Sequence, residues 1–183
     1  EYLKSKGYKK LTVVCDQNTY RVAGSRVCAA LDKGGIAYKL HQFHEANVLP
    51  NEHFVGNLAM GMALDCDLVM AVGSGTINDI CRYVSAVAGK PYCVVGTAPS
   101  MDGFVSSGAA LIVDHVKVTY EAQGPAAFIA DTEILARAPM EMITAGLGDM
   151  LGKYTCLLDW KLAHLITGEY YCEHVEGMVR TAL

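Results

Sequence analysis

Residues 67–78 read DLVMAVGSGTIN and decide the fold, because an apolar run changes directly into a glycine-rich turn and then into a helical pattern. The apolar residues 68–72 show no alternation with polar side chains, which is typical of a strand buried on both faces of a parallel sheet. Gly73 and Gly75 supply the turn. This stretch therefore predicts a buried strand that passes through a tight turn into a helix.

Similar units lie on both sides of this stretch. Short apolar runs alternate with segments of helical periodicity, and Gly34-Gly35 and Gly89 stand where two of the helices should end. The expected strands cover residues 11–15, 36–43 and 91–95, and the expected helices follow the turn at 16–18 as far as 31, cover 51–64, and close at 85–88. This alternation predicts an α/β fold with a Rossmann-like parallel sheet and helical crossovers, which we assign to residues 1–131.

The pattern changes beyond this sheet. Residues 97–108 are rich in Ser, Gly, Pro and Asp, and residues 111–121 hold two short strand-like runs that predict a hairpin. From Pro139 onward apolar residues recur at helical spacing, so residues 132–183 are expected to begin an all-helical domain for metal and substrate. Three glycines between residues 145 and 153 are unfavourable in a helix by about 1 kcal/mol each, which predicts close approach of a backbone or a ligand.

Composition excludes several classes of protein. The net charge is −4 and the sequence has no basic run, which argues against nucleic acid as a partner. Seven cysteines without a CxxC pair indicate reduced thiols and a cytoplasmic protein. No apolar run approaches the roughly 20 residues that span a bilayer. The chain begins with Glu1 and its last residues show no helix stop signal, so we expect that both ends are cut.

The turn after the strand at 67–72 has the form of an anion site. Gly73, Ser74, Gly75 and Thr76 open a helix, where backbone N–H groups and the helix dipole converge on one point. The spacing is Gly-x-Gly-x-x-Asn, so the usual dinucleotide fingerprint is not met. From these residues alone, phosphate binding and a plain tight turn remain equally open.

Two further polar segments are candidates for chemistry. Thr97 and Ser100 follow the next buried strand and could bind a cofactor, while Asp102 could hold a substrate hydroxyl. The plain alternative, favoured by residue type, is an Asx turn in which Asp102 bonds its own backbone. Asp149 lies in the glycine-rich stretch, and a helix-surface ion pair with Lys153 is its plain alternative.

Three stretches taken together resemble the bacterial glycerol-1-phosphate dehydrogenases of the iron-containing alcohol dehydrogenase and dehydroquinate synthase superfamily. They are residues 71–79, residues 97–103 (TAPSMDG) and residues 146–160, which include GDMLGKYT. The resemblance implies an enzyme that interconverts dihydroxyacetone phosphate and sn-glycerol 1-phosphate by hydride transfer with NAD(H) or NADP(H). It also implies a cytoplasmic homodimer with a role in phospholipid biosynthesis.

The resemblance carries roles to individual residues. Those around the cofactor pyrophosphate are Gly73, Ser74, Gly75, Thr76 and Ile77, and those on the nicotinamide side are Thr97, Ala98, Pro99, Ser100 and Ser106. Asp16 would hold the adenosine ribose, which favours NAD over NADP. Asp102 would bind substrate. Asp149 would be the catalytic first ligand of one divalent metal (zinc, nickel or iron) that also touches substrate, and two histidines beyond residue 183 would complete the shell.

Other interpretations remain open at this point. If residues 149–164 form one helix, Asp149 and His164 are roughly 22 Å apart, so His164 and His174 are not expected to be ligands. Arg137 and Lys153 are weaker candidates for contact with a substrate phosphate. The chain could instead be a glycerol, polyol or alcohol dehydrogenase of the same superfamily, or a nucleotide-binding module without catalysis. We expect residues 1–183 alone to show no appreciable turnover.

Overall fold

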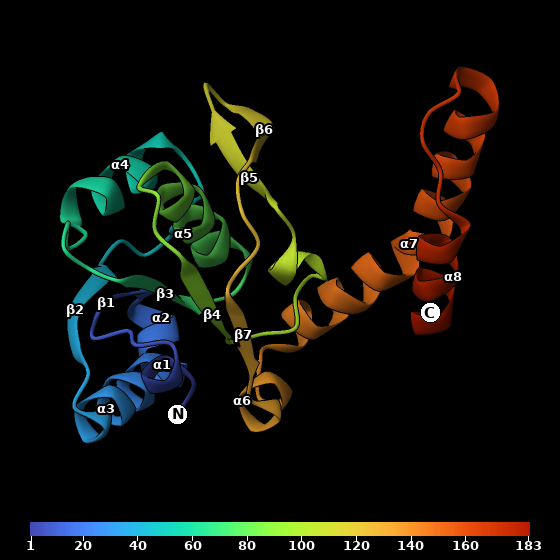
Figure 1. Ribbon diagram of the computed structural model, residues 1–183. Helices are drawn as coiled ribbons and strands as arrows, with labels where there is room; N and C mark the ends of the chain where they lie inside the picture. Colours follow the sequence, from blue (N-terminus) through green and yellow to red (C-terminus); the bar gives the residue numbers. More distant parts are fainter.

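The computed structural model describes all 183 residues and contains one parallel sheet of five strands (Figure 1). The strands are β1 (Lys10–Asp16), β2 (Ala37–Phe43), β3 (Leu68–Gly73), β4 (Tyr92–Gly96) and β7 (Ala127–Ala130), and their order is β2-β1-β3-β4-β7. All four pairings are parallel, and every residue of β3 is buried. The predicted α/β class with a parallel sheet is confirmed.

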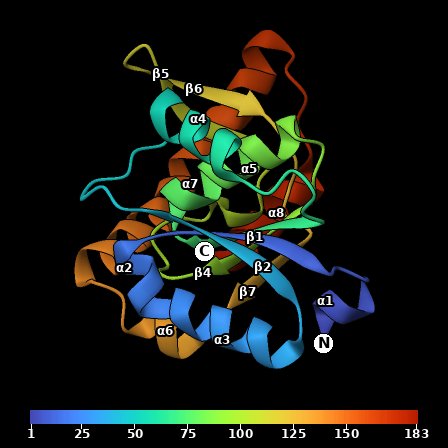
Figure 2. The ribbon, with the colours of Figure 1, turned by 90° about the vertical axis from the view of Figure 1, so that its left-hand side faces the viewer.

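Helices cover both faces of the sheet (Figure 2). On one face lie α1 (Tyr2–Ser5), α2 (Gln17–Thr19), a π-helical turn and α3 (Ser25–Gly34), and on the other lie α4 (Glu52–Gly61) and α5 (Gly75–Val87). Successive residues of a strand point to opposite faces, so Val13 packs under α3 while Val14 packs under α4 and α5. The helix α3 ends at Gly35, whose left-handed φ of 67° suits glycine.

The segment after β4 leaves the sheet and returns to it. A short 3-10 turn at Gly103–Val105 leads into an antiparallel hairpin of β5 (Gly108–Val113) and β6 (Val116–Glu121), as predicted. The hairpin packs against α5, with the rings of Tyr83 and Tyr120 5.2 Å apart. The chain then forms β7, an edge strand that the sequence pattern did not predict because it has only four residues and is mostly exposed.

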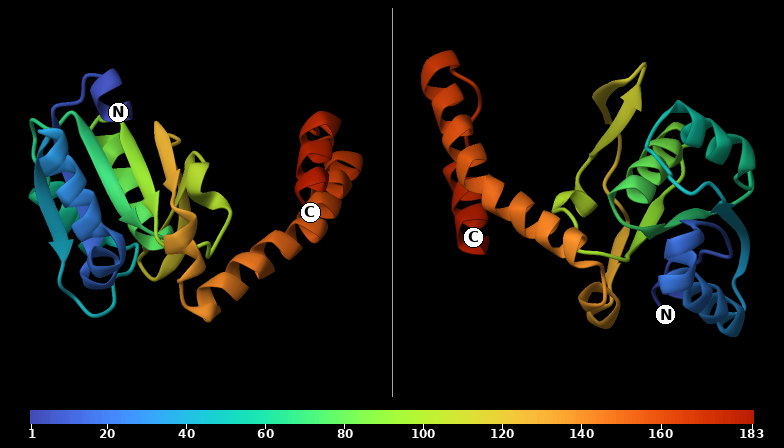
Figure 3. Two further views of the ribbon diagram at one scale, coloured as in Figure 1. Left: turned by 90° about the horizontal axis from the view of Figure 1, so that it is seen from below. Right: turned by 180° about the vertical axis from the view of Figure 1, so that it is seen from behind.

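The remaining chain is helical. α6 (Thr132–Ala136) still packs on the sheet through Ile134. α7 (Met140–Thr167) projects away from the sheet, and α8 (Glu173–Ala182) folds back along α7 (Figure 3). Trp160 of α7 donates to the carbonyl of Tyr170, which fixes the turn between these helices. The division at 131/132 stays a prediction. None of the helices is both long and apolar enough to span a bilayer.

Candidate active site

A polar cleft of about 730 Å³ lies at the carboxyl ends of three neighbouring strands. Its walls come from Asp16 at the end of β1, from Ser74–Ile77 after β3 and from Thr97, Ala98 and Ser100 after β4. The chain runs from β1 outward to β2 and then returns to β3, so the direction of strand order reverses between β1 and β3. Open α/β sheets bind ligands at such a reversal, and we therefore take this cleft as the candidate site.

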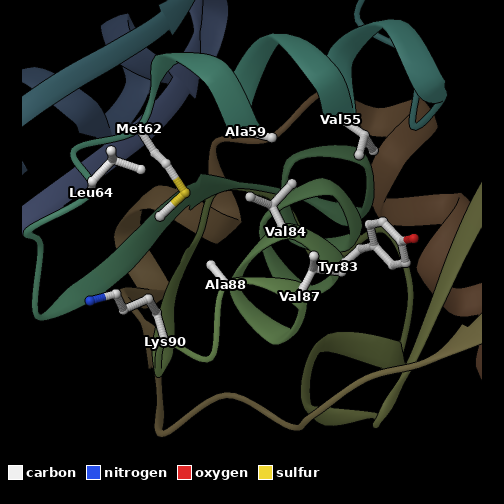
Figure 4. A pocket seen from close by; sticks show the side chains of 9 residues that line it. All are labelled: Val55, Ala59, Met62, Leu64, Tyr83, Val84, Val87, Ala88 and Lys90. Carbon is white, nitrogen blue, oxygen red and sulfur yellow. The ribbon is translucent and has the colours of Figure 1, made fainter.

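A second cavity, between α4 and α5, differs in chemistry (Figure 4). It measures about 280 Å³, and its only polar side chains, Tyr83 and Lys90, direct their polar atoms outward in the close view. The lining residues are Val55, Ala59, Met62, Leu64, Tyr83, Val84, Val87, Ala88 and Lys90. Its lining is almost entirely apolar and offers no side chain suited to a phosphate or a ribose, which leaves the polar cleft as the better candidate.

The N-terminus of α5 forms one wall of the cleft. The first hydrogen bond of this end runs from the N–H of Asn78 to the carbonyl of Ser74, at 3.0 Å, so the N–H groups of Gly75, Thr76 and Ile77 have no partner within the protein. A Cβ on Gly73 would lie 2.6 Å from Ile77, whereas one on Gly75 would meet only Met101, at 3.7 Å. The open end of a helix with three free amides is suited to an anion.

The loop after β4 joins this wall. The N–H of Thr97 donates to the carbonyl of Gly73 at 3.2 Å, and the hydroxyls of Ser74 and Ser100 are hydrogen-bonded to each other. Of the residues expected on the nicotinamide side, Pro99 and Ser106 do not line the cleft. The 3-10 turn carries Ser106 toward the hairpin, where its hydroxyl donates to the carbonyl of Gly108 at 3.1 Å.

Asp16 stands at the far end of the cleft and is held rigidly. Its carboxylate accepts the N–H of Thr19 at 2.8 Å, and the hydroxyl of Thr19 accepts the N–H of Asp16 at 3.0 Å, which is a reciprocal capping arrangement at α2. Sequence reasoning missed Arg21, which lines the cleft at this end. Arg137, just after α6, also lines the cleft and forms no ion pair, so it contributes a free positive charge.

Asp102 and Asp149 meet where α7 passes the loop after β4. The N–H of Asp102 donates to Oδ2 of Asp149 at 2.8 Å, and Nζ of Lys153 lies 2.9 Å from Oδ2 of Asp102. The backbone bond lowers the pKa of Asp149, and the Asp102 carboxylate raises the pKa of Lys153. Both plain alternatives are therefore wrong: Asp102 caps no turn with its own side chain, and Lys153 pairs with Asp102 rather than with Asp149.

Gly146 explains the approach of α7. A Cβ at this position would lie 1.8 Å from the carbonyl oxygen of Pro99, so only glycine allows the helix to pass the loop at this distance. The predicted close approach of a backbone is confirmed at Gly146. It does not hold at Gly148 and Gly152, where an added Cβ would meet nothing within 4 Å.

The described residues provide one candidate metal ligand rather than a complete site. No group of three or more His, Cys, Asp or Glu side chains lies close enough to hold a metal ion. Asp149 and His164 belong to one continuous helix, and Nδ1 of His164 bonds the carbonyl of Glu169. As expected, His164 does not join Asp149.

Arg82 is a second residue that sequence reasoning missed. It lies on α5, is only 1% exposed, and pairs with Asp79 at 2.7 Å. Burial raises the pKa of Asp79 to about 6 although Arg82 acts in the opposite direction. The only signal in the sequence was a charged residue three positions after Asp79 in a largely apolar helix, and that spacing is equally common on exposed helix faces.

Comparison with known proteins assigns the chain to a family. The family model described as iron-containing alcohol dehydrogenase matches residues 1–139. The chain belongs to this family. The match covers the whole sheet and all three cleft loops. Among the iron-containing alcohol dehydrogenases and their relatives, glycerol-1-phosphate dehydrogenase (NAD(P)+) of Halalkalibacterium halodurans is 44% identical over 186 residues, which is 100% of this chain and 47% of that protein. The chain thus spans about half the length of the curated relatives it matches.

Several solved structures share the fold of this chain. Glycerol dehydrogenase from Schizosaccharomyces pombe superposes with a TM-score of 0.71 and 20% identity over 84% of this chain and 40% of that one. The 2-epi-5-epi-valiolone synthase from Streptomyces hygroscopicus, solved with NAD+ and Zn2+ bound, gives a TM-score of 0.71 and 16% identity over 88% of this chain and 49% of that one. At these identities the likeness establishes the fold alone.

Proposed function

We propose that the protein is an NAD(P)-dependent dehydrogenase that interconverts dihydroxyacetone phosphate and sn-glycerol 1-phosphate by hydride transfer. The observation that carries this proposal is the polar cleft at the strand-order reversal, built by loops of a chain that is 44% identical to a glycerol-1-phosphate dehydrogenase. The relative's name states both the substrate and NAD(P)+.

The residues of the cleft suit a dinucleotide. The free amides of Gly75, Thr76 and Ile77 would bind the pyrophosphate, and Arg137 would add a charge to that contact. The carboxylate of Asp16 would accept hydrogen bonds from the hydroxyls of the adenosine ribose, which favours NAD over NADP. Arg21 at the same end leaves binding of a 2′-phosphate open. The valiolone synthase of similar fold was solved with NAD+ bound, which supports a dinucleotide as the cofactor.

We assign Asp149 the role of ligand for a divalent ion, with zinc, nickel and iron as candidates. Its lowered pKa keeps the carboxylate ionised, as a metal ligand must be, and the amide of Asp102 fixes one of its oxygens. A bound ion would act as a Lewis acid on the substrate carbonyl. Residues 1–183 supply this single ligand, so further ligands would have to come from elsewhere.

Asp102 and Lys153 would serve the substrate directly. The Asp102 carboxylate is partly exposed beside Asp149 and can accept a hydrogen bond from a substrate hydroxyl. Lys153 neutralises part of the charge of the two carboxylates, which would reduce their repulsion of a phosphorylated substrate. A homodimer acting in the cytoplasm belongs to the same proposal, and light scattering would test the dimer.

The test uses the protein expressed at its full gene-encoded length, with zinc, nickel or iron added separately. NADH oxidation is followed with dihydroxyacetone phosphate, dihydroxyacetone and simple aldehydes. We expect metal-dependent oxidation confined to the phosphorylated ketone and lost in Asp149→Asn, but kept in the control Asp159→Asn, because Asp159 lies exposed on the same helix without a partner. Preference for an unphosphorylated carbonyl would indicate a polyol or alcohol dehydrogenase. If NADH is not oxidised with any of the metals and substrates, only a nucleotide-binding module remains.

A further inference from the structure

Arg82 uses all the donors of its guanidinium group inside the protein. Nε donates to the hydroxyl of Tyr92 at 2.8 Å, and Nη1 donates to Asp79 and to the carbonyl of Gly108, both at 2.7 Å. Nη2 donates to the carbonyls of Gly103 and Phe104 at 2.8 and 2.9 Å. Arginine carries five N–H groups, so none is left for a ligand or for water.

Three of these five bonds end on one segment of main chain. Gly103 and Phe104 belong to the 3-10 turn that joins the loop after β4 to the hairpin, and Gly108 is the first residue of β5. The side-chain amide of Asn78, also on α5, donates to the same carbonyl of Phe104 at 3.4 Å. This turn has almost no regular structure of its own, so its conformation depends on bonds from α5.

The turn directly follows Asp102. Two of the three carbonyls that Arg82 holds belong to the first two residues after Asp102, and the N–H of Asp102 is the donor to Asp149. A shift of this segment would therefore move that N–H away from the carboxylate on α7. We propose that Arg82 is a positioning residue that holds residues 103–108 so that the amide of Asp102 stays hydrogen-bonded to Asp149. The role of Asp149 as a metal ligand rests on the proposed function, whereas the hydrogen bond itself does not.

The choice of a buried charge supports this role. A buried cation is unfavourable unless it is paired and fully hydrogen-bonded, and an apolar side chain could fill the same space at lower cost. Asp79 supplies the counter-charge from the same helix. What an apolar residue could not do is bind three carbonyls at once, and lysine, with three donors on one atom, could not reproduce the planar fork.

The test compares Arg82→Lys with Tyr92→Phe by hydrogen–deuterium exchange. Tyr92→Phe removes an acceptor of the same guanidinium group but leaves the three bonds to the turn, so it controls for loss of stability alone. We expect exchange of amides 101–108 to rise about tenfold in Arg82→Lys while amides of β3 and β4 stay protected, and to change less than about twofold in Tyr92→Phe. Unchanged exchange at 101–108 in Arg82→Lys, or an equal rise in Tyr92→Phe, would overturn the inference.

Asn78→Leu provides a second variant if Arg82→Lys folds poorly. Oδ1 of Asn78 is buried without a partner, so leucine should be tolerated, and the loss of the bond to Phe104 should give the same local pattern at about threefold. If exchange of these amides does not rise in Asn78→Leu, that result would also overturn the inference.

A binding and kinetic measurement separates this inference from the proposed function. In the full-length protein, Arg82→Lys should lower kcat with dihydroxyacetone phosphate about tenfold and leave KM for NADH within about twofold, because Arg82 forms no hydrogen bond with Gly75, Thr76 or Ile77. If the unaltered protein shows no turnover, the proposed function fails, and the exchange experiment still decides the role of Arg82.

Discussion

Replacing Gly146 with alanine tests whether the contact of α7 with the loop after β4 is as close as the structure indicates. The new Cβ would lie 1.8 Å from the carbonyl oxygen of Pro99, so helix and loop must separate by about 1.7 Å to reach ordinary contact. The same movement would stretch the 2.8 Å bond between the Asp102 amide and Asp149 beyond hydrogen-bond range.

The magnitude follows from two opposing effects. Loss of a bond to a charged acceptor costs about 1.5 to 3 kcal/mol, while alanine is favoured over glycine inside a helix by up to about 1 kcal/mol. We therefore expect Gly146→Ala to lower the free energy of unfolding by about 0.5 to 2 kcal/mol. Gly148→Ala and Gly152→Ala are matched controls on the same helix with nothing within 4 Å, and each should raise it by about 0.5 to 1 kcal/mol.

The assay is urea denaturation followed by circular dichroism and by the fluorescence of Trp160, which is the only tryptophan and lies on α7. Hydrogen exchange at Asp102 reports the local contact. The reasoning would be refuted if Gly146→Ala were as stable as Gly148→Ala and kept the Asp102 amide protected.

Three further predictions concern the cleft and its surroundings. Gly75→Val should reduce NADH affinity at least about tenfold, because the valine side chain would block access to the free amides. The melting temperature should change little, since only Met101 lies near an added Cβ. Calorimetric titration and a thermal melt check this, and unchanged affinity would indicate that the loop is a plain turn. Burial raises the pKa of Asp79 to about 6 from an ordinary value of 3.8, so the native state binds more protons than the unfolded state. The native state therefore loses stability as pH rises from about 3.8 through about 6. In urea titrations, the free energy of unfolding of Asp79→Asn should rise by about 1 kcal/mol relative to that of the unaltered chain as pH increases from about 5 to 7.5. The same pH dependence in both proteins would contradict the raised pKa. Asp16→Ser keeps a capping oxygen for Thr19 but removes the carboxylate, so the NADPH to NADH affinity ratio should rise about tenfold, and a constant ratio would exclude Asp16 from the ribose site.

The sheet was largely predictable because its signals are local. The strand β3 is a continuous apolar run and is buried throughout, and α3 ends at Gly35 where the sequence placed a stop. The strand β7 escaped prediction because a four-residue exposed edge strand carries no periodicity. The order of the strands in the sheet could not be predicted from the sequence either, since it depends on which crossovers pack together.

The candidate site divides in the same way. Ser74, Gly75 and Thr97 were found from their place after buried strands, and the structure brings them to one cleft. Ser106 was expected there and lies elsewhere. Arg137 was considered only as a contact for substrate phosphate, yet it lines the polar cleft from more than 30 residues further along the chain.

The sequence by itself determined the parallel sheet, the glycine-rich turn after β3 and the glycine-dependent approach in α7, because each depends on neighbouring residues whose spacing sets burial or backbone freedom. Only the tertiary structure decided that Lys153 pairs with Asp102, that the amide of Asp102 holds Asp149, and that Arg82 is buried beneath the turn. Charged and polar side chains have many possible partners, and packing of distant elements selects among them. A sequence pattern shows that such a residue is present, but the partner is chosen by the fold.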